Sequence, residues 1–232
     1  MVEKIRKYVR VLNFNEGRNV MSLNDCGKTL LNALLSGLFI GIGGTIFLAC
    51  PNPIVGAFLF TIGLMMIVCY GFNLYTGAIG YLIQHKDDSL AYLLKLVLIW
   101  IGNLGGCWIV GNAIRSSRTF VKVDLKIAAV CADKLNDSWQ SLLILSIFCG
   151  LLMYMAVETY RREDLAPVFR FGGLFLCISV FIMSGFEHCI ANMYYFTLGD
   201  VWSWQAFGLI LLMTLGNSIG GWLVPVADKF RK

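Results

Sequence analysis

The chain has 232 residues, of which 58% are hydrophobic and 14% are charged. Soluble domains carry about 25% charged residues, so the composition excludes an ordinary water-soluble domain. The distribution of charge is more restrictive, because no Asp, Glu, Lys or Arg occurs in the 57 residues from Thr29 to His85. Further charge-free runs cover Leu96–Ile114, Ser138–Val157, Phe171–Phe186 and Val201–Ala227. Since a membrane-spanning helix needs about 20 apolar residues, the sequence predicts an all-α polytopic membrane protein, whereas a membrane β-barrel would show short alternating segments.

The first 28 residues form a polar segment with six basic residues and without the apolar core of a cleavable signal peptide. We therefore expect the N-terminus to be retained, and the pattern of residues 1–20 predicts an amphipathic interfacial helix in the cytoplasm. The expected organisation is an N-terminal segment over 1–28, a single six-helix membrane domain over 29–227 and a cytoplasmic tail over 228–232. This topology explains the net charge of +5 better than nucleic acid as a partner does.

Loop signals divide the charge-free runs into six expected membrane spans, and the turn Cys50-Pro51-Asn52-Pro53 separates the first two. The spans are 29–49, 54–83, 90–114, 138–159, 168–198 and 202–227. With the N-terminus inside, 14 of the 19 Lys and Arg residues fall on the inner side and five, all within 115–134, on the outer side. This excess predicts that both termini are cytoplasmic and that the protein is a multi-pass protein of the cytoplasmic (inner) membrane.

The second and fifth spans are each about 30 residues long and carry polar residues at mid-length, which indicates broken helices. Gly71-Phe72-Asn73-Leu74 stands 114 residues before Gly185-Phe186-Glu187-His188, and Gly102-Asn103 stands at the same offset before Gly216-Asn217. Three spans per copy is an odd number, so this pattern predicts an inverted 3+3 repeat over about 29–114 and 138–227. Inverted repeats with interrupted helices place a permeation site near the bilayer midplane. Chance matches between glycine-rich membrane helices are the alternative.

His188 is the leading functional candidate, because an ionisable residue within an apolar span is costly unless it faces a cavity or a partner. An imidazole titrates near neutral pH, which suits a proton donor or relay for a passing anion. Thr76 lies where a helix is expected to restart, and its hydroxyl can donate to an anion or to His188. Backbone amides at such helix starts also favour anions. The alternatives are a structural histidine and a threonine bonded to its own backbone.

Glu187 is adjacent to His188 and cannot face the same way in an extended break. We therefore expect it to support the loop through backbone amides or through Asn192, with Asn73 supporting the other break. A second set of residues flanks the breaks and is expected to form apolar constrictions that gate by dewetting, although core packing would explain each one singly. These residues are Phe60, Leu64, Leu74 and Phe181.

Neither the cysteines nor the outer basic residues indicate a metal or an organic cofactor. The eight cysteines occur singly, without the spacing of a zinc site or a redox dithiol, and we interpret most of them as apolar fillers. The basic segment from Arg115 to Lys134 would draw anions to the outer mouth, and a solvated loop is the equally good alternative.

The segment Ser184–Met193, with the sequence SGFEHCIANM, resembles the fifth-helix signature of the formate/nitrite transporter family. The sequence NLYTG at 73–77 is similar to the second-helix loop of that family, and the two Gly-Asn pairs to its third and sixth helices. The resemblance covers nearly the whole chain. It implies an aquaporin-like fold and a homopentamer in the lipid bilayer, in which every protomer encloses its own pore for small monovalent anions such as formate, nitrite, hydrosulfide, acetate or lactate.

Carried over by position, the resemblance implies that His188 is the central pore histidine and that Thr76 is its hydrogen-bonding partner. The other positions that it places along the pore are Leu64 and Leu74 at the cytoplasmic constriction, Phe60 and Phe181 at the outer constriction, and Lys134 in the vestibule. Three positions depart from the family pattern. Gly150 stands where many members carry an asparagine near the vestibule, Tyr75 replaces a phenylalanine, and Asn73 replaces a frequent aspartate. The identity of the anion therefore stays open.

The expected function is that of a channel or proton-coupled transporter for a small weak-acid anion, with protons passing through His188. A neutral-solute pore of the aquaporin type is the first alternative, but it needs two Asn-Pro-Ala elements and only Asn52-Pro53-Ile54 approaches one. A membrane-embedded enzyme that uses Glu187 and His188 is the second. Because no second catalytic cluster or metal-ligand spacing accompanies this pair, we expect the protein not to be an enzyme.

Overall fold

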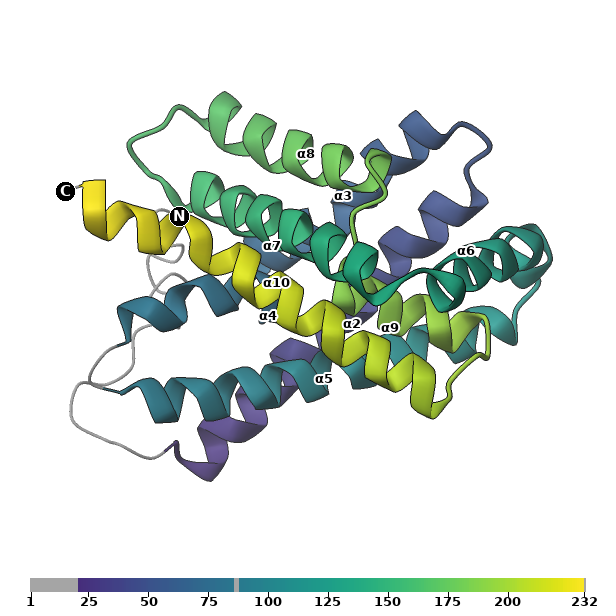
Figure 1. Cartoon of the computed structure of the whole chain (residues 1–232), viewed down its shortest axis with the longest axis horizontal. Helices are drawn as coiled ribbons and strands as arrows, with labels where there is room; N and C mark the ends of the chain where they lie inside the picture. Colours follow the sequence, from purple (N-terminus) through teal and green to yellow (C-terminus); the bar gives the residue numbers. More distant parts are fainter. Residues whose placement is uncertain (1–20, 86–87, 232) are drawn as a thin grey trace.

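The computed structural model describes residues 21–85 and 88–231, and within these ranges it contains helices and no strand (Figure 1). The longer helices are α2 (Leu23–Ala49), α3 (Pro53–Tyr70), α5 (Ser89–Arg115), α7 (Trp139–Arg161), α8 (Pro167–Met183) and α10 (Trp204–Arg231). The shorter ones are α4 (Tyr75–Ala78), η2 (Ile79–Gln84), η3 (Phe120–Lys122), α6 (Asp124–Asn136) and α9 (Cys189–Leu198).

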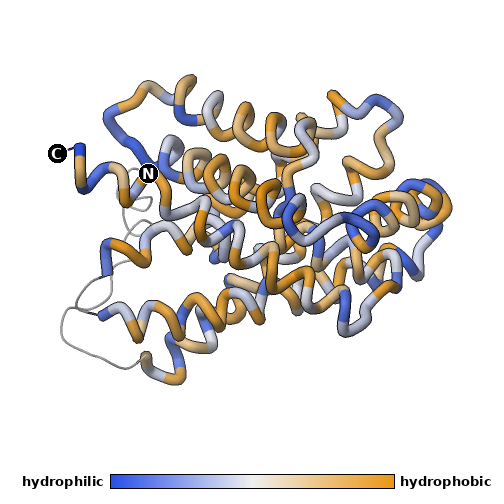
Figure 2. Tube along the Cα trace, in the orientation of Figure 1, coloured by the Kyte–Doolittle hydropathy of each residue, from blue (hydrophilic) through white to orange (hydrophobic). Residues whose placement is uncertain are grey.

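Five of these helices, α2, α3, α5, α7 and α10, are long and apolar enough to cross a membrane, and α8 is an apolar helix of 17 residues. Figure 2 shows the hydrophilic residues gathered toward the two ends of the helix bundle, with apolar residues between them. Many large apolar side chains between these ends are exposed, among them Phe58, Trp108 and Leu176. Because exposed apolar side chains over such a band fit lipid and not water, the chain is a multi-pass membrane protein.

Polar caps determine where several helices begin. The Ser22 hydroxyl accepts a hydrogen bond from the Asp25 amide at 3.2 Å and starts α2. The Asn52 carboxamide oxygen accepts from the amides of Ile54 and Val55 at 3.0 and 3.1 Å. Such side-chain acceptors satisfy amides that have no partner within the helix. The turn that the sequence predicts between the first two spans is therefore the cap of α3.

Three expected boundaries differ from the structure. The first helix begins at Leu23 and not at 29, because the Ser22 cap precedes the charge-free run on which the expectation was based. Helix α10 continues to Arg231, so residues 228–231 of the expected cytoplasmic tail are helical. The basic segment 115–134 is not a plain loop, since it contains η3 and most of α6. The helix expected over residues 1–20 lies outside the described residues.

Two glycines end the helices that precede the extended segments. Helix α3 stops at Tyr70, followed by Gly71 with φ of 70°, and α8 stops at Met183, shortly before Gly185 with φ of 68°. The next residue closes each turn, because the amides of Phe72 and Phe186 donate to carbonyl oxygens of α3 and α8, both at 2.9 Å. Glycine adopts this left-handed conformation without a steric penalty. The chain then runs extended before α4 and α9 begin.

Glycine also permits close helix crossings. A Cβ atom at Gly106 of α5 would overlap the Leu34 carbonyl oxygen of α2, and one at Gly220 of α10 would overlap the Ile147 carbonyl oxygen of α7. Gly150 of α7 faces the Asn217 carbonyl oxygen of α10 at the same crossing, and it is absent from the residues lining the cavity described below. In this chain the space beside position 150 is filled by the backbone of α10, which leaves no room for an asparagine side chain there.

We expect Gly150→Asn to destabilise the protein by about 3 kcal/mol or more, because the new side chain must displace the backbone of α10. The thermal unfolding midpoint in detergent and the yield of monodisperse protein measure the effect. Gly172→Asn is the matched control, since nothing lies within 4 Å of a Cβ at Gly172. Equal stability of the two variants would contradict the close packing of α7 on α10.

Candidate functional site

The two extended segments bring Thr76 and His188 together although 112 residues separate them. Thr76 lies in the first turn of α4, and His188 is the residue that caps α9. Thr76 Oγ1 and His188 Nε2 are 2.8 Å apart, and the two residues are 0% and 2% exposed. The structure thus places the two main candidates from the sequence in one buried hydrogen bond.

The second ring nitrogen of His188 defines the tautomer. His188 Nδ1 accepts a hydrogen bond from the Ala191 amide at 3.0 Å, as the cap of α9. Since Nδ1 acts as an acceptor, a neutral ring carries its proton on Nε2 and donates it to Thr76 Oγ1. A doubly protonated ring would direct an N–H toward the Ala191 N–H. Protonation of His188 is therefore coupled to the cap of α9.

Asn103 of α5 holds the first extended segment in place. Its Oδ1 accepts from the Tyr75 amide at 2.9 Å, and its Nδ2 donates to the carbonyl oxygens of Ala33 at 2.8 Å and Asn73 at 2.9 Å. Asn73 itself contributes a longer bond, from Nδ2 to the Thr29 carbonyl oxygen at 3.4 Å. Buried backbone groups need such partners, and Asn103 supplies them where the helix is interrupted.

Asn217 of α10 makes the corresponding bonds at the second extended segment. Its Oδ1 accepts from the Cys189 amide at 2.9 Å, and its Nδ2 donates to the carbonyl oxygens of Ser146 and Glu187, both at 2.8 Å. Our site prediction missed both asparagines, although the two Gly-Asn pairs stand 114 residues apart in the sequence. The available signal was an amide side chain within each of two charge-free spans.

Two aromatic rings lie next to His188. The rings of Phe60 and Phe181 meet edge to face with centroids 6.1 Å apart, and the Phe181 ring stacks on the His188 ring at 5.8 Å. Both phenylalanines are buried, although both reach the cavity described below. The two phenylalanine rings therefore lie beside His188 and next to the cavity, where an apolar barrier would have to lie.

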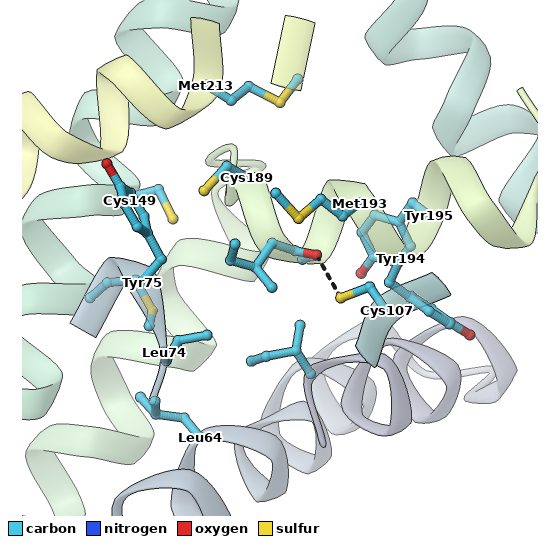
Figure 3. Packing of buried hydrophobic residues seen from close by; sticks show 14 of the residues in the cluster. Leu64, Leu74, Tyr75, Cys107, Cys149, Cys189, Met193, Tyr194, Tyr195 and Met213 are labelled. Carbon is cyan, nitrogen blue, oxygen red and sulfur yellow. Dashed lines mark hydrogen bonds between the residues drawn. The ribbon is translucent and has the colours of Figure 1, made fainter. Parts of the chain in front are cut away.

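Leu64 and Leu74 lie in the buried apolar cluster drawn in Figure 3 and do not line that cavity. The same cluster contains Cys107, whose Sγ donates to the Ile190 carbonyl oxygen at 3.3 Å (Figure 3). All eight cysteines are free, and Cys69 is the exposed one. Across residues 21–85 and 88–231, no group of three His, Cys, Asp or Glu side chains is arranged to hold a metal ion.

Glu187 is held by two side chains. Lys134, near the end of α6, places its Nζ 2.7 Å from each carboxylate oxygen of Glu187. The Asn192 amide Nδ2 donates to Glu187 Oε2 at 2.7 Å. Of the two kinds of support expected for Glu187, the structure therefore shows the one through Asn192, and it adds an ion pair with Lys134 in place of a lysine that is free to attract anions.

A cavity of about 310 Å³ opens beside these groups, and we name it the vestibule. Its lining residues are Phe47, Phe60, Val130, Asp133, Lys134, Asp137, Phe181, Ile182, Gly185, Phe186, Glu187, His188, Ala191, Asn192 and Tyr195. The charged side chains among them are three carboxylates and one ammonium group. The carboxylates come from Asp133 of α6, from Asp137 directly after α6 and from Glu187. Attraction of anions by the basic segment 115–134 stays a prediction.

Other basic residues of that segment are also engaged. Arg115 forms an ion pair with Asp200 at 2.6 Å, and this pair holds the pKa of the Asp200 carboxyl below its usual range. Lys126 Nζ donates to the Phe47 carbonyl oxygen at 3.0 Å, at the end of α2. Arg115 thus ties the end of α5 to the loop after α9, and Lys126 ties α6 to the end of α2.

The chain is similar to known proteins over most of its length. The model of the family described as formate/nitrite transporter matches residues 14–227. The nitrite transporter NirC of Escherichia coli K12 is 27% identical over an alignment of 250 positions, which covers 91% of each chain. The formate channel FocA of Haemophilus influenzae is 24% identical over 202 positions, which cover 73% of this chain and 70% of FocA.

Two solved structures share the fold. An FNT family ion channel superimposes with a TM-score of 0.80 at 21% identity, over the full length of both chains. A pentameric formate channel with formate bound superimposes with a TM-score of 0.77 at 22% identity, over 90% of this chain and 98% of that one. These relatives are transporters and channels, not enzymes. Because the family model matches nearly the whole chain, this protein belongs to the formate/nitrite transporter family.

Proposed function

We propose that the protein conducts a small monovalent anion of a weak acid across the cytoplasmic membrane, as a channel or a proton-coupled transporter. The observation that carries the proposal is the buried bond between Thr76 and His188, at the meeting point of two interrupted helices and beside a cavity. Relatives named as nitrite and formate carriers indicate the substrate class. An ionisable group at such a place in a membrane protein marks an ion or proton pathway.

The proposed architecture is an aquaporin-like inverted repeat of three spans each, in which α3 with α4 and η2, and α8 with α9, form the broken spans. The hydrogen bonds of Asn103 and Asn217 support it, because they recur on residues 113 or 114 positions apart. The proposal includes cytoplasmic termini, and a homopentamer in which each protomer has its own pore. The formate channel that shares the fold is described as pentameric.

Two apolar constrictions enclose His188 in this proposal, with Phe60 and Phe181 on the vestibule side and Leu64 and Leu74 on the cytoplasmic side. All four side chains are at most 3% exposed. Moving an unpaired charge through a dry constriction costs several kcal/mol or more, whereas a small neutral acid avoids most of this cost. The transported species therefore leaves His188 as the neutral acid and crosses the next constriction in that form.

His188 serves as the proton relay, and its tautomer determines the direction of the relay. A proton arrives at Nδ1, which gives up its bond to the Ala191 amide, and the proton on Nε2 passes to an anion that has replaced Thr76 as the acceptor. The neutral acid then leaves, and Nε2 takes up a proton from water while Nδ1 releases one to water, which restores the original bonds to Thr76 and to the Ala191 amide. One proton enters and one leaves with the acid.

Flux measurements in proteoliposomes test the proposal. We expect at least one of formate, nitrite, hydrosulfide, acetate and lactate to enter faster than into protein-free liposomes, and to enter faster still as the external pH falls. Water and glycerol permeation in the same vesicles tests the neutral-solute alternative. Absence of protein-dependent flux for all five anions, with rapid glycerol entry, would overturn the assignment in favour of that alternative.

A further inference from the structure

The hydroxyl group of Tyr195 belongs to the wall of the vestibule. Tyr195 of α9 lines this cavity and is 8% exposed, and its hydroxyl has no hydrogen-bond partner among the described residues. In the same part of the chain, the unpartnered polar atoms that are sealed inside the protein are Ser36 Oγ, Ser179 Oγ and Asn192 Oδ1. Since the Tyr195 hydroxyl is not one of these sealed atoms, it is open to the vestibule.

The adjacent tyrosine shows the usual state of a buried hydroxyl. Tyr194 is 0% exposed and is absent from the vestibule lining, and its hydroxyl lies 2.6 Å from Thr45 Oγ1. Because Thr45 Oγ1 donates to the Gly41 carbonyl oxygen, Tyr194 is the donor in this pair. Figure 3 shows the two tyrosine side chains leaving α9 in different directions. Buried hydroxyls normally find a partner, so the open hydroxyl of Tyr195 points to a ligand that accepts a hydrogen bond.

Most other polar side chains that line the vestibule have no hydrogen left to donate. The ionised carboxylates only accept hydrogen bonds. Asn192 Nδ2 uses its two hydrogens on neighbouring side chains, and the neutral His188 ring donates its Nε2 hydrogen to Thr76. An anion in the vestibule therefore depends on Lys134 and Tyr195 for side-chain donors.

Lys134 lies next to Tyr195 and retains one hydrogen. Its Nζ is 5.9 Å from the centroid of the Tyr195 ring, and its side chain is 14% exposed. An ammonium group has three hydrogens, and the Glu187 carboxylate oxygens accept two of them, both at 2.7 Å. The third can be donated to an anion while the ion pair stays intact. The wall of the vestibule thus offers one O–H and one N–H donor side by side.

We propose that the Tyr195 hydroxyl donates a hydrogen bond to an oxygen of the anion in the vestibule, and that this bond favours oxyanions over hydrosulfide. The inference rests on the proposed function and narrows its substrate class to a small oxyanion, either a carboxylate or nitrite. A hydrogen bond to a charged oxygen is short and about twice as strong as one between neutral groups. Sulfur is a weak acceptor, so hydrosulfide gains less from Tyr195 than formate or nitrite does.

Tyr195→Phe tests this assignment because it removes the hydroxyl alone. The ring stays beside the Lys134 ammonium, and no described residue loses a hydrogen-bond partner, so we expect the variant to fold as the wild type does. In proteoliposomes at constant pH, the formate or nitrite concentration for half-maximal influx should rise about tenfold, with little change in the maximal rate. Where influx does not saturate, the initial rate per unit concentration should fall by the same factor. The hydrosulfide curve should stay unchanged.

Tyr194→Phe is the matched control, since it removes a hydroxyl from the adjacent residue, outside the vestibule. We expect it to keep the wild-type concentration dependence for all three anions. The pH profile of influx should be the same in Tyr195→Phe as in the wild type, because His188 keeps both of its hydrogen bonds.

Three results would overturn the inference and leave the proposed function standing. One is an unchanged formate and nitrite curve in Tyr195→Phe. Another is an equal loss for hydrosulfide, which would indicate an altered pore shape and not a lost contact to oxygen. The third is a wild type that carries hydrosulfide but no oxyanion. Absence of wild-type flux for every anion would instead refute the proposed function, and this inference with it.

Discussion

Replacing His188 by asparagine is expected to leave a folded protein whose influx of weak-acid anions no longer rises as the pH falls. Asparagine is a strong helix-capping residue, so its side-chain oxygen can accept from the Ala191 amide in place of Nδ1. It cannot take up a proton, and the relay beside Thr76 is lost. At acidic external pH we expect the rate to fall by about 100-fold, which is the range of a lost general acid.

Stopped-flow influx over a series of external pH values measures this effect, and thermal unfolding in detergent reports whether the variant is folded. His85→Asn is the control, because His85 is the second of the two histidines and lies at the end of η2, away from the Thr76 bond. It should keep the pH dependence of the wild type. An unchanged pH profile in His188→Asn would remove His188 from proton transfer and leave it as the cap of α9.

The ends of α3 and α8 could be predicted from the sequence because the signal is local. Runs without charge exceed one membrane crossing, and Gly71 and Gly185 stand where a helix must stop. For the Thr76 hydroxyl the residues left an anion or His188 as alternative partners, and the family resemblance implied His188, which is the partner in the structure. The Gly-Phe and Gly-Asn pairs recur at an offset of 114 residues, and this alone indicates that the two extended segments are equivalent.

The surroundings of these segments could not be predicted, because they depend on which helix lies opposite. The departure from the family pattern at Gly150 did not reveal that this residue packs against the backbone of α10. The charge of the vestibule depends on which side chains of α6 line it. A count of basic residues between 115 and 134 does not show which side chains these are. Lys134 counts as a cation in the sequence, whereas in the structure it neutralises Glu187.

A further prediction with a large effect concerns Asn103 and Asn217, which hold the two extended segments in place. Asn217→Leu keeps the side-chain volume nearly constant but removes three hydrogen bonds, which leaves the Cys189 amide and the carbonyl oxygens of Ser146 and Glu187 without their partner. Each buried group that loses its partner costs about 1–3 kcal/mol. We therefore expect the free energy of unfolding to fall by about 3 kcal/mol or more.

Denaturant or thermal unfolding in detergent measures this loss, with Asn112→Leu as the control. Asn112 also lies in a long helix, but its side chain makes one bond, to the carbonyl oxygen of Trp108 at 2.8 Å. Asn103→Leu should lose about as much stability as Asn217→Leu, since it breaks the corresponding three bonds at the other extended segment. If either variant were as stable as Asn112→Leu, that asparagine would not hold its break, and the equivalence of the two halves would fail at the residues that define it.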